Sequence, residues 1–234
     1  MILITGGTGM VGKHLKDILP EAHYVGSEYD LRDWNQTLEL FETYKPTRVV
    51  HLAAKVGGII DNINKQAEYF DENILMNTNI ISMCRKYKVD RFTAMLSTCI
   101  YPDKVDNYPM TESDLYMGPP PPTNFSYAYA KRCMAVQIGA YNQQYKTKYN
   151  YLISCNLFSE LDNFEDGDKM HFVTALLKKI KNANSEIELL GTGKPLRQFM
   201  YAGDLAKVIK EVIKKDITES FNVAPNYNYS INEM

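Results

Sequence analysis

The sequence predicts an α/β fold, a doubly wound parallel sheet with a smaller C-terminal lobe, and three observations lead to this expectation. Short apolar segments typical of strands alternate with segments of helical periodicity as far as Cys155. A glycine-rich turn separates the first apolar segment from the first helical one. After Asn156 the alternation becomes irregular. Strands that alternate with helices form right-handed βαβ units, so the sheet should carry helices on both faces.

Each expected element follows from its local pattern. Apolar runs bounded by turn residues predict strands, and apolar residues spaced three or four apart predict helices. Pro20 should end the first helix, and Asp33 should cap the second. Residues 115–123, with four consecutive prolines, and the polar residues 162–168 are expected loops. The expected strands are 1–5, 23–25, 47–54, 92–97, 149–155, 186–190 and 220–223, and the expected helices are 10–19, 34–44, 66–88, 124–145, 170–181 and 203–215.

The irregular second part of the chain predicts a second lobe. We expect residues 1–156 to form a nucleotide-binding domain and residues 157–234 to form part of a further lobe, some of whose elements return to the first domain. Ser230 followed by Glu233 is typical of a helix start. The sequence is therefore expected to break off inside the second lobe.

Composition excludes several classes of protein. The 234 residues include 26 Lys plus Arg and 28 Asp plus Glu, a balance that argues against a nucleic-acid partner. No apolar run approaches the roughly 18 residues of a membrane span, and no basic segment precedes the first apolar run. The cysteines, none of them in a C-x-x-C pair, indicate free thiols of a cytoplasmic protein without a metal site. They are Cys84, Cys99, Cys133 and Cys155.

The glycine-rich turn carries the first functional signal. Gly6, Gly9 and Gly12 follow a G-x-x-G-x-x-G spacing between the first strand and the first helix. Glycine permits the sharp turn, the approach of a pyrophosphate and close packing of helix on strand. The backbone amides at the helix start, including those of Met10 and Val11, would bind the phosphates. This combination indicates a Rossmann-type dinucleotide site.

The choice between NAD and NADP depends on the end of the second strand. Ser27 at the adenosine ribose would tolerate a 2′-phosphate, whereas Glu28 there would favour NAD. The nearest arginine that could bind a 2′-phosphate is Arg32. The alternative is that Glu28 and Asp30 are simply solvated loop charges.

A proton-transfer set follows in the middle of the chain. Tyr127 and Lys131 lie four residues apart near a predicted helix start, so they share one face of the helix. A lysine ammonium beside a phenol lowers the pKa of the tyrosine, and it can also hold the nicotinamide ribose. Ser97 ends the fourth main strand, where ligands of such sheets bind, and it could hydrogen-bond a carbonyl. The set is typical of carbonyl reduction.

These features together resemble the extended short-chain dehydrogenase/reductase family, and within it the GDP-L-fucose synthase branch. The resemblance covers residues 1 to about 205, and its most specific stretches contain HLAAKVGG and STCIYP. The chain departs from the branch at Ser154, Cys155, Ser159, Glu160 and Leu190. The matching stretches are ILITGGTGMVGKHL, PTRVVHLAAKVGGI, LSTCIYPDK, NFSYAYAKR, DNF with the following His171, and GTGKPLRQFMYAGDLA.

The resemblance implies an activity and roles for residues. The activity is NADPH-dependent epimerisation of GDP-4-keto-6-deoxy-D-mannose at C3 and C5, followed by reduction at C4. Cys99 would be the base and His171 the acid, while Ser97 and Tyr127 would hold the C4 oxygen. The resemblance places Leu52, Ala53, Ala54 and Asn156 at the cofactor, and Ser97, Asn156, His171, Lys179 and Arg197 at the GDP-sugar.

Alternatives remain open at this point. Cys99 could be a small buried residue, His171 a surface residue, and Lys179 part of a solvated helix face. The chain could act on another nucleotide sugar as an epimerase, dehydratase or reductase, or it could bind a dinucleotide without catalysis. Helices 66–88 and 124–145 could form a homodimer interface, but their apolar residues fit core packing as well.

Overall fold

The computed structural model describes residues 1–164, 170–189 and 191–234. A six-stranded sheet in the order β2-β1-β3-β4-β5-β9 forms its centre, and every neighbouring pair in it is parallel. The expected doubly wound parallel sheet is therefore confirmed. The strands are β1 (Ile2–Thr5), β2 (His23–Val25), β3 (Arg48–His51), β4 (Arg91–Ser97), β5 (Tyr149–Ser154) and β9 (Phe221–Val223).

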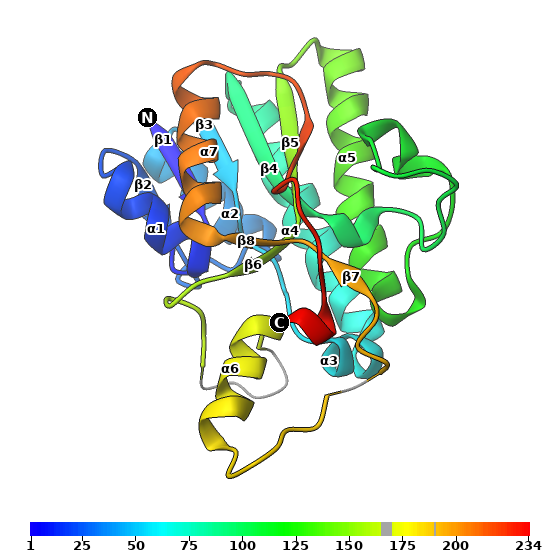
Figure 1. Cartoon of the computed structure of the whole chain (residues 1–234). Helices are drawn as coiled ribbons and strands as arrows, with labels where there is room; N and C mark the ends of the chain where they lie inside the picture. The colour runs from blue at the N-terminus through cyan, green and yellow to red at the C-terminus, as the bar shows by residue number, and fades with distance from the viewer. Residues whose placement is uncertain (165–169, 190) are drawn as a thin grey trace.

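Helices cover both faces of this sheet (Figure 1). On one face, α1 (Met10–Ile18) and α7 (Ala202–Lys214) bury leucines and isoleucines against the strands. The other face is covered by α2 (Trp34–Tyr44), α4 (Gln66–Lys86) and α5 (Phe125–Tyr145). The sheet thus lies between two apolar layers, and its strands are buried from both sides.

The smaller elements gather below the carboxyl ends of the strands (Figure 1). There β6 pairs in parallel with β8, and β7 pairs antiparallel with β10. Three short 3₁₀ turns, at Thr98–Ile100, Glu112–Tyr116 and Pro122–Asn124, connect β4 to α5, and another spans Ile231–Glu233. The remaining elements are α3 (Ile59–Asn64), α6 (Phe172–Asn182), β6 (Asn156–Phe158), β7 (Leu196–Arg197), β8 (Phe199–Tyr201) and β10 (Tyr229–Ser230).

Most expected elements agree with the structure to within a few residues. The Asp33 side chain caps α2 by accepting hydrogen bonds from the backbone amides of Asn35 and Gln36. Ser230 and Glu233 form a reciprocal capping box on the last 3₁₀ turn. On α4, one of the two helices considered for a dimer interface, Ile80, Ile81 and Met83 are fully buried in the core of the chain itself.

Two strand predictions need correction. The strand expected over 47–54 ends at His51, because its neighbour β1 ends at Thr5 and the chain beyond passes against Gly6. The strand expected over 186–190 does not form at residues 186–189, where the Glu188 carbonyl accepts a hydrogen bond from Lys179 Nζ instead of from a neighbouring strand. Leu190 lies outside the described residues.

The helices of the described ranges include none with the length and apolar character needed to cross a lipid bilayer.

Candidate active site

The phosphate-binding turn is built where β1 meets α1. Gly9 is the N-cap of α1, and no side chain caps the helix there. The first amides of the helix, from Met10 onward, therefore keep their donors for an anion at a partially positive helix end. Gly6 has a φ of +70°, a left-handed conformation that favours glycine.

Close packing shows why the turn needs glycine. A Cβ on Gly12 would lie 2.5 Å from the Gly7 carbonyl oxygen, and one on Gly6 would lie 2.6 Å from the Ala53 nitrogen. The turn is therefore pressed against Leu52 and Ala53, two residues that the resemblance assigns to the cofactor. Backbone approach of this kind, with exposed helix amides, fits a dinucleotide pyrophosphate.

The end of β2 borders the same turn. Both carboxylate oxygens of Glu28 accept a hydrogen bond from the Gly26 amide at 2.9 Å, and Ser27 is exposed. Arg32, the nearest arginine, pairs with Asp30 and Glu72. In this structure Glu28 is thus bound to the loop itself, and Arg32 is held by carboxylates.

The reductase set meets at the carboxyl end of β4. Ser97 ends this strand, Cys99 lies on the 3₁₀ turn that follows, and the Cys99 thiol is hydrogen-bonded to the Ser97 side chain. The first turns of α5 bring Tyr127 and the buried Lys131 to the same place, and Cys99 interacts electrostatically with both. Lys131 Nζ donates to the Met95 carbonyl at 3.0 Å. A hydroxyl, a thiol, a phenol and an amine therefore converge on one edge of the sheet.

Burial dominates the ionisation of this set. It lowers the pKa of Lys131 to about 8, against a smaller opposing effect of Cys99. It raises the pKa of Cys99 to about 11, while the Ser97 hydrogen bond and the Lys131 charge oppose the rise. The lowered pKa expected for Tyr127 is wrong for this structure: burial, with Cys99 and Tyr69 nearby, raises it.

A buried polar network lies behind these groups. His51, at the end of β3, has Nδ1 2.7 Å from Thr5 Oγ1 and Nε2 3.1 Å from Asn77 Oδ1. The Asn77 side-chain amide donates to the Ala130 carbonyl, next to Lys131, at 3.3 Å. The network joins β1, β3, α4 and α5, and sequence analysis missed it because these residues are far apart in the chain.

A buried arginine fixes the turn that carries Cys99. Arg132 donates to the Ile100 carbonyl through Nε at 2.9 Å and through Nη2, and to the Gly118 carbonyl through Nη1 at 2.8 Å. Its partners are carbonyls of two different loops, so α5 anchors both loops beside the thiol.

His171 lies apart from this set, at the N-cap of α6. Its Nδ1 atom is 3.1 Å from Asp162 Oδ2. Burial raises the pKa of Asp162. Hydrogen bonds from His171 and Thr174 lower it by more than burial raises it, so the pKa lies below its ordinary value. Sequence analysis placed Asp162 in a polar loop and did not assign it to the site.

The other candidate residues lie on separate elements of the smaller lobe. Asn156 begins β6 and donates through Nδ2 to the Gln198 carbonyl at 3.0 Å. Lys179 is exposed on α6 and lines a hollow between that helix and residues 186–188. Arg197 is exposed on β7, where Nη1 donates to the Leu196 carbonyl. Their roles toward a substrate stay predictions.

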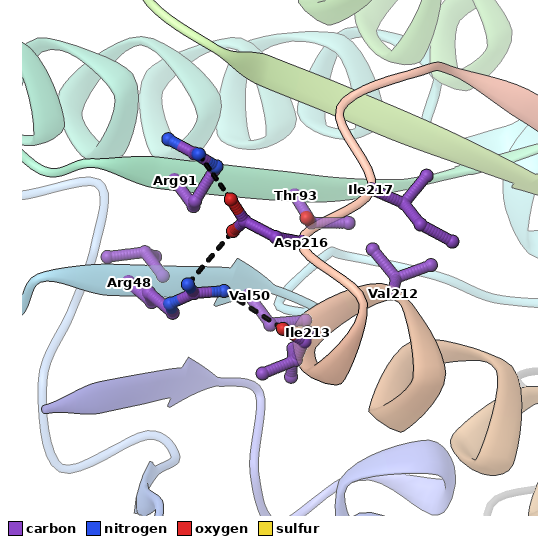
Figure 2. Close-up of a pocket in the computed structure, with 9 residues that line it drawn as sticks. Arg48, Val50, Arg91, Thr93, Val212, Ile213, Asp216 and Ile217 are labelled. Atoms are coloured by element: carbon purple, nitrogen blue, oxygen red, sulfur yellow. Dashed lines mark hydrogen bonds and ion pairs between the residues drawn. The ribbon is translucent and has the colours of Figure 1, made fainter.

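A different pocket lies at the opposite edge of the sheet (Figure 2). Asp216 there pairs with Arg48, at the start of β3, and with Arg91, at the start of β4. Arg48 also donates to the Ile213 carbonyl at 3.0 Å. These contacts attach the end of α7 to the amino ends of the strands, so we interpret this pocket as structural.

The fold and the site define a class of protein. A glycine-rich turn at the start of α1 and a Ser-Tyr-Lys set at the end of β4 are joined in one parallel sheet. Residues 2–224 match the NAD dependent epimerase/dehydratase family, and the chain belongs to this family.

Two similar proteins and one solved structure indicate which branch of the family this chain resembles. The chain is 41% identical over 218 residues to the GDP-L-fucose synthase of Dictyostelium discoideum, a match that covers 88% of this chain and 67% of that protein. It is 32% identical to the GDP-L-colitose synthase of Yersinia pseudotuberculosis, over 99% of this chain and 79% of that one. A crystal structure of a GDP-L-fucose synthetase from Naegleria fowleri bound to NADP superposes with a TM-score of 0.87 at 35% identity, covering 99% of this chain and 79% of that one. The resemblance to the GDP-L-fucose synthases is confirmed.

Proposed function

We propose that this protein makes GDP-L-fucose from GDP-4-keto-6-deoxy-D-mannose by epimerisation at C3 and C5 and NADPH-dependent reduction at C4. The observation that carries the proposal is the position of Cys99 within the Ser97, Tyr127 and Lys131 set. A simple carbonyl reductase needs no thiol there, whereas epimerisation next to a ketone needs an additional proton-transfer group. The similarity to GDP-L-fucose synthases supports the same substrate.

The residues of the phosphate turn would hold the cofactor. Gly6 and Gly12 leave room for the pyrophosphate, and the amides of Met10 and Val11 bind it. Lys131 would hold the nicotinamide ribose, and Leu52, Ala53, Ala54, Gly9, Ser27 and Asn156 would complete the site. NADPH, when bound, supplies the hydride for C4. The relative from Naegleria fowleri, solved with NADP, supports NADP over NAD.

The chain's own groups handle the protons. Ser97 and Tyr127 donate hydrogen bonds to the C4 oxygen, which makes the protons at C3 and C5 acidic by stabilising the enolate. Cys99 removes a proton from one face of the sugar, and His171 delivers one to the other face. Burial raises the pKa of Cys99 to about 11, and the Ser97 hydrogen bond and the Lys131 charge oppose this rise by favouring the thiolate. Tyr127 finally donates its proton to the C4 oxygen. Lys179 and Arg197 would bind the diphosphate.

The test separates the two half-reactions. Deuterium incorporation at C3 and C5 in D₂O without NADPH reports epimerisation, and loss of absorbance at 340 nm with NADPH reports reduction. We expect Cys99→Ser to lower the exchange rate at least about 100-fold, in the range of a lost general base. The half-buried Cys133, two residues past Lys131 on α5, provides the matched control Cys133→Ser, which should exchange at the parental rate.

Two results would contradict the proposal. Parental exchange in Cys99→Ser would show that the thiol is not the base. Turnover only with another GDP-sugar would favour the second candidate, a related nucleotide-sugar enzyme, which the similarity to a GDP-L-colitose synthase supports.

We also propose that the protein is a cytoplasmic homodimer. Phe70 and Leu75 on α4 and Val136 on α5 are exposed apolar residues that a helical interface would cover. The four free cysteines support a reducing compartment. Size-exclusion chromatography with light scattering would measure the assembly.

A further inference from the structure

The carboxylate of Asp162 is buried and lies directly beside His171. Its side chain is only 7% exposed, and both of its oxygens lie within 3.2 Å of His171 Nδ1. Thr174, in the first turn of α6, donates a hydrogen bond from its hydroxyl to Oδ2, and the Asn163 backbone amide donates to Oδ1 at 2.9 Å. Each of these three described contacts is made by a hydrogen-bond donor.

This arrangement determines which ring nitrogen of His171 carries the proton. An ionised carboxylate only accepts hydrogen bonds, so Nδ1 must bear a hydrogen. Hydrogen bonds from His171 and Thr174 keep the pKa of Asp162 below its ordinary value, so the group is an anion near neutral pH. The Nε2 edge of the ring points away from the carboxylate, and the His171 side chain is 37% exposed. His171 can therefore transfer protons only through Nε2.

Within the described residues, three other charged side chains near this loop have partners of their own. Lys13 on α1 donates to the Leu161 carbonyl at 3.3 Å, and Lys178 on α6 donates to the Phe164 carbonyl at 2.8 Å. Glu160 accepts the Tyr201 hydroxyl at 2.7 Å. Among the described contacts of His171, Asp162 is thus the carboxylate that sets its charge and orientation.

We propose that Asp162 is a positioning residue that holds the His171 ring with Nδ1 protonated and Nε2 directed toward the sugar. The inference rests on the proposed function, because it assumes that His171 is the acid of the epimerisation. In that step the Nε2–H bond breaks and a C–H bond forms at the carbanion carbon. The ring is then neutral and still hydrogen-bonded to Asp162 through Nδ1. Solvent returns the proton to Nε2.

The test is Asp162→Asn, measured in two independent ways. Loss of the carboxylate behind a metal-bound histidine typically costs about 10- to 100-fold in activity, and we expect a fall of at least about 10-fold in the exchange kcat here, with KM nearly unchanged. In the ¹⁵N spectrum of the imidazole, the Nδ1–H signature of neutral His171 should give way to the Nε2–H form. Asp17→Asn, an exposed carboxylate on α1, should change neither measurement.

A second variant covers the case in which Asp162→Asn does not fold. Thr174→Val keeps the volume but removes one donor to the carboxylate, and we expect a roughly 3- to 10-fold lower exchange kcat, with the Nδ1–H form retained. Exchange within two-fold of the parent in a folded Asp162→Asn, or a parental Nε2–H tautomer, overturns the proposal. If the parent itself exchanges no protons, the proposed function is wrong, and the tautomer alone decides whether Asp162 positions His171.

Discussion

Lys131 and His51 are two buried basic residues of the site, and they differ in charge near neutral pH. Burial lowers the pKa of His51 to about 3, and the Lys131 charge contributes to this shift. His51 is therefore neutral near pH 7, and it serves as a hydrogen-bond bridge between Thr5 and Asn77. Lys131, whose pKa is about 8, keeps its charge near neutral pH, where it favours the thiolate of Cys99.

The neutral state of His51 predicts a pH dependence of stability. Its pKa in the folded protein lies below the ordinary value of 6.5, so between pH 6.5 and 3 the unfolded chain binds a proton that the folded chain does not. The stability is fully present above pH 6.5 and is lost as the pH falls through this window. Each pH unit between the folded and unfolded pKa values corresponds to about 1.4 kcal/mol, so the complete loss is at most about 5 kcal/mol.

Urea unfolding between pH 7 and pH 4 measures this effect. His51→Gln should be less stable at pH 7, because hydrogen bonds are lost, but its stability should fall less steeply with decreasing pH than that of the parent. His23→Gln, at an exposed position, should keep the parental slope. An unchanged slope in His51→Gln would show that another group causes the acid sensitivity.

At the scale of elements, local patterns were sufficient to locate the long helices and the six strands of the central sheet. The caps at Asp33 and Ser230 and the turn at Gly6 depend on neighbours within a few residues, so the sequence predicts them well. The short pair β6 and β8 depends on partners more than 40 residues apart, which periodicity does not reveal. Asp162 lies in a loop, as expected, but the polar pattern of that loop does not show that its side chain contacts His171, nine residues later.

The junction of β1 and α1 gives a prediction about the cofactor. Gly12→Ala would push a methyl group into the Gly7 backbone, at 2.5 Å from its carbonyl oxygen, and displace the phosphate turn. We expect NADPH to bind at least about 10-fold more weakly, which corresponds to about 1.4 kcal/mol. Fluorescence titration of NADPH measures this without any turnover.

Gly139→Ala is the matched control within α5. A Cβ at this exposed glycine meets nothing within 4 Å. The change should leave the Kd for NADPH unaltered and stabilise the protein by about 0.5 to 1 kcal/mol, because alanine is the better helix former. Equal Kd values for Gly12→Ala and the parent would contradict the tight packing of the turn.

At the scale of the whole molecule, the last third of the chain completes the central sheet. Strand β9 extends the sheet beside β5, and α7 packs next to α1 over one face (Figure 1). Helix α6 lies away from the sheet, so residues 157–234 contribute to both parts. The domain boundary at 156 stays a prediction. The sequence led us to expect that some elements of this stretch return to the first domain. Which ones do so depends on contacts between segments some 200 residues apart, such as Ile4 and Leu205 in one apolar cluster.

This arrangement predicts that the two faces of the sheet unfold together. Ile209 on α7 is fully buried against the sheet, whereas the single tryptophan, Trp34, lies on α2 at the opposite face. Ile209→Ala should lower the free energy of unfolding by about 2 to 5 kcal/mol through loss of apolar contacts and formation of a cavity. If the sheet couples its two layers, Trp34 fluorescence and far-UV circular dichroism will give the same reduced urea midpoint.

The control is Ile180→Ala, at a position that is 51% exposed on α6. Its free energy of unfolding should stay within about 0.5 kcal/mol of that of the parent. A Trp34 midpoint that remains parental while the dichroism midpoint falls would show that the α1–α7 layer unfolds on its own.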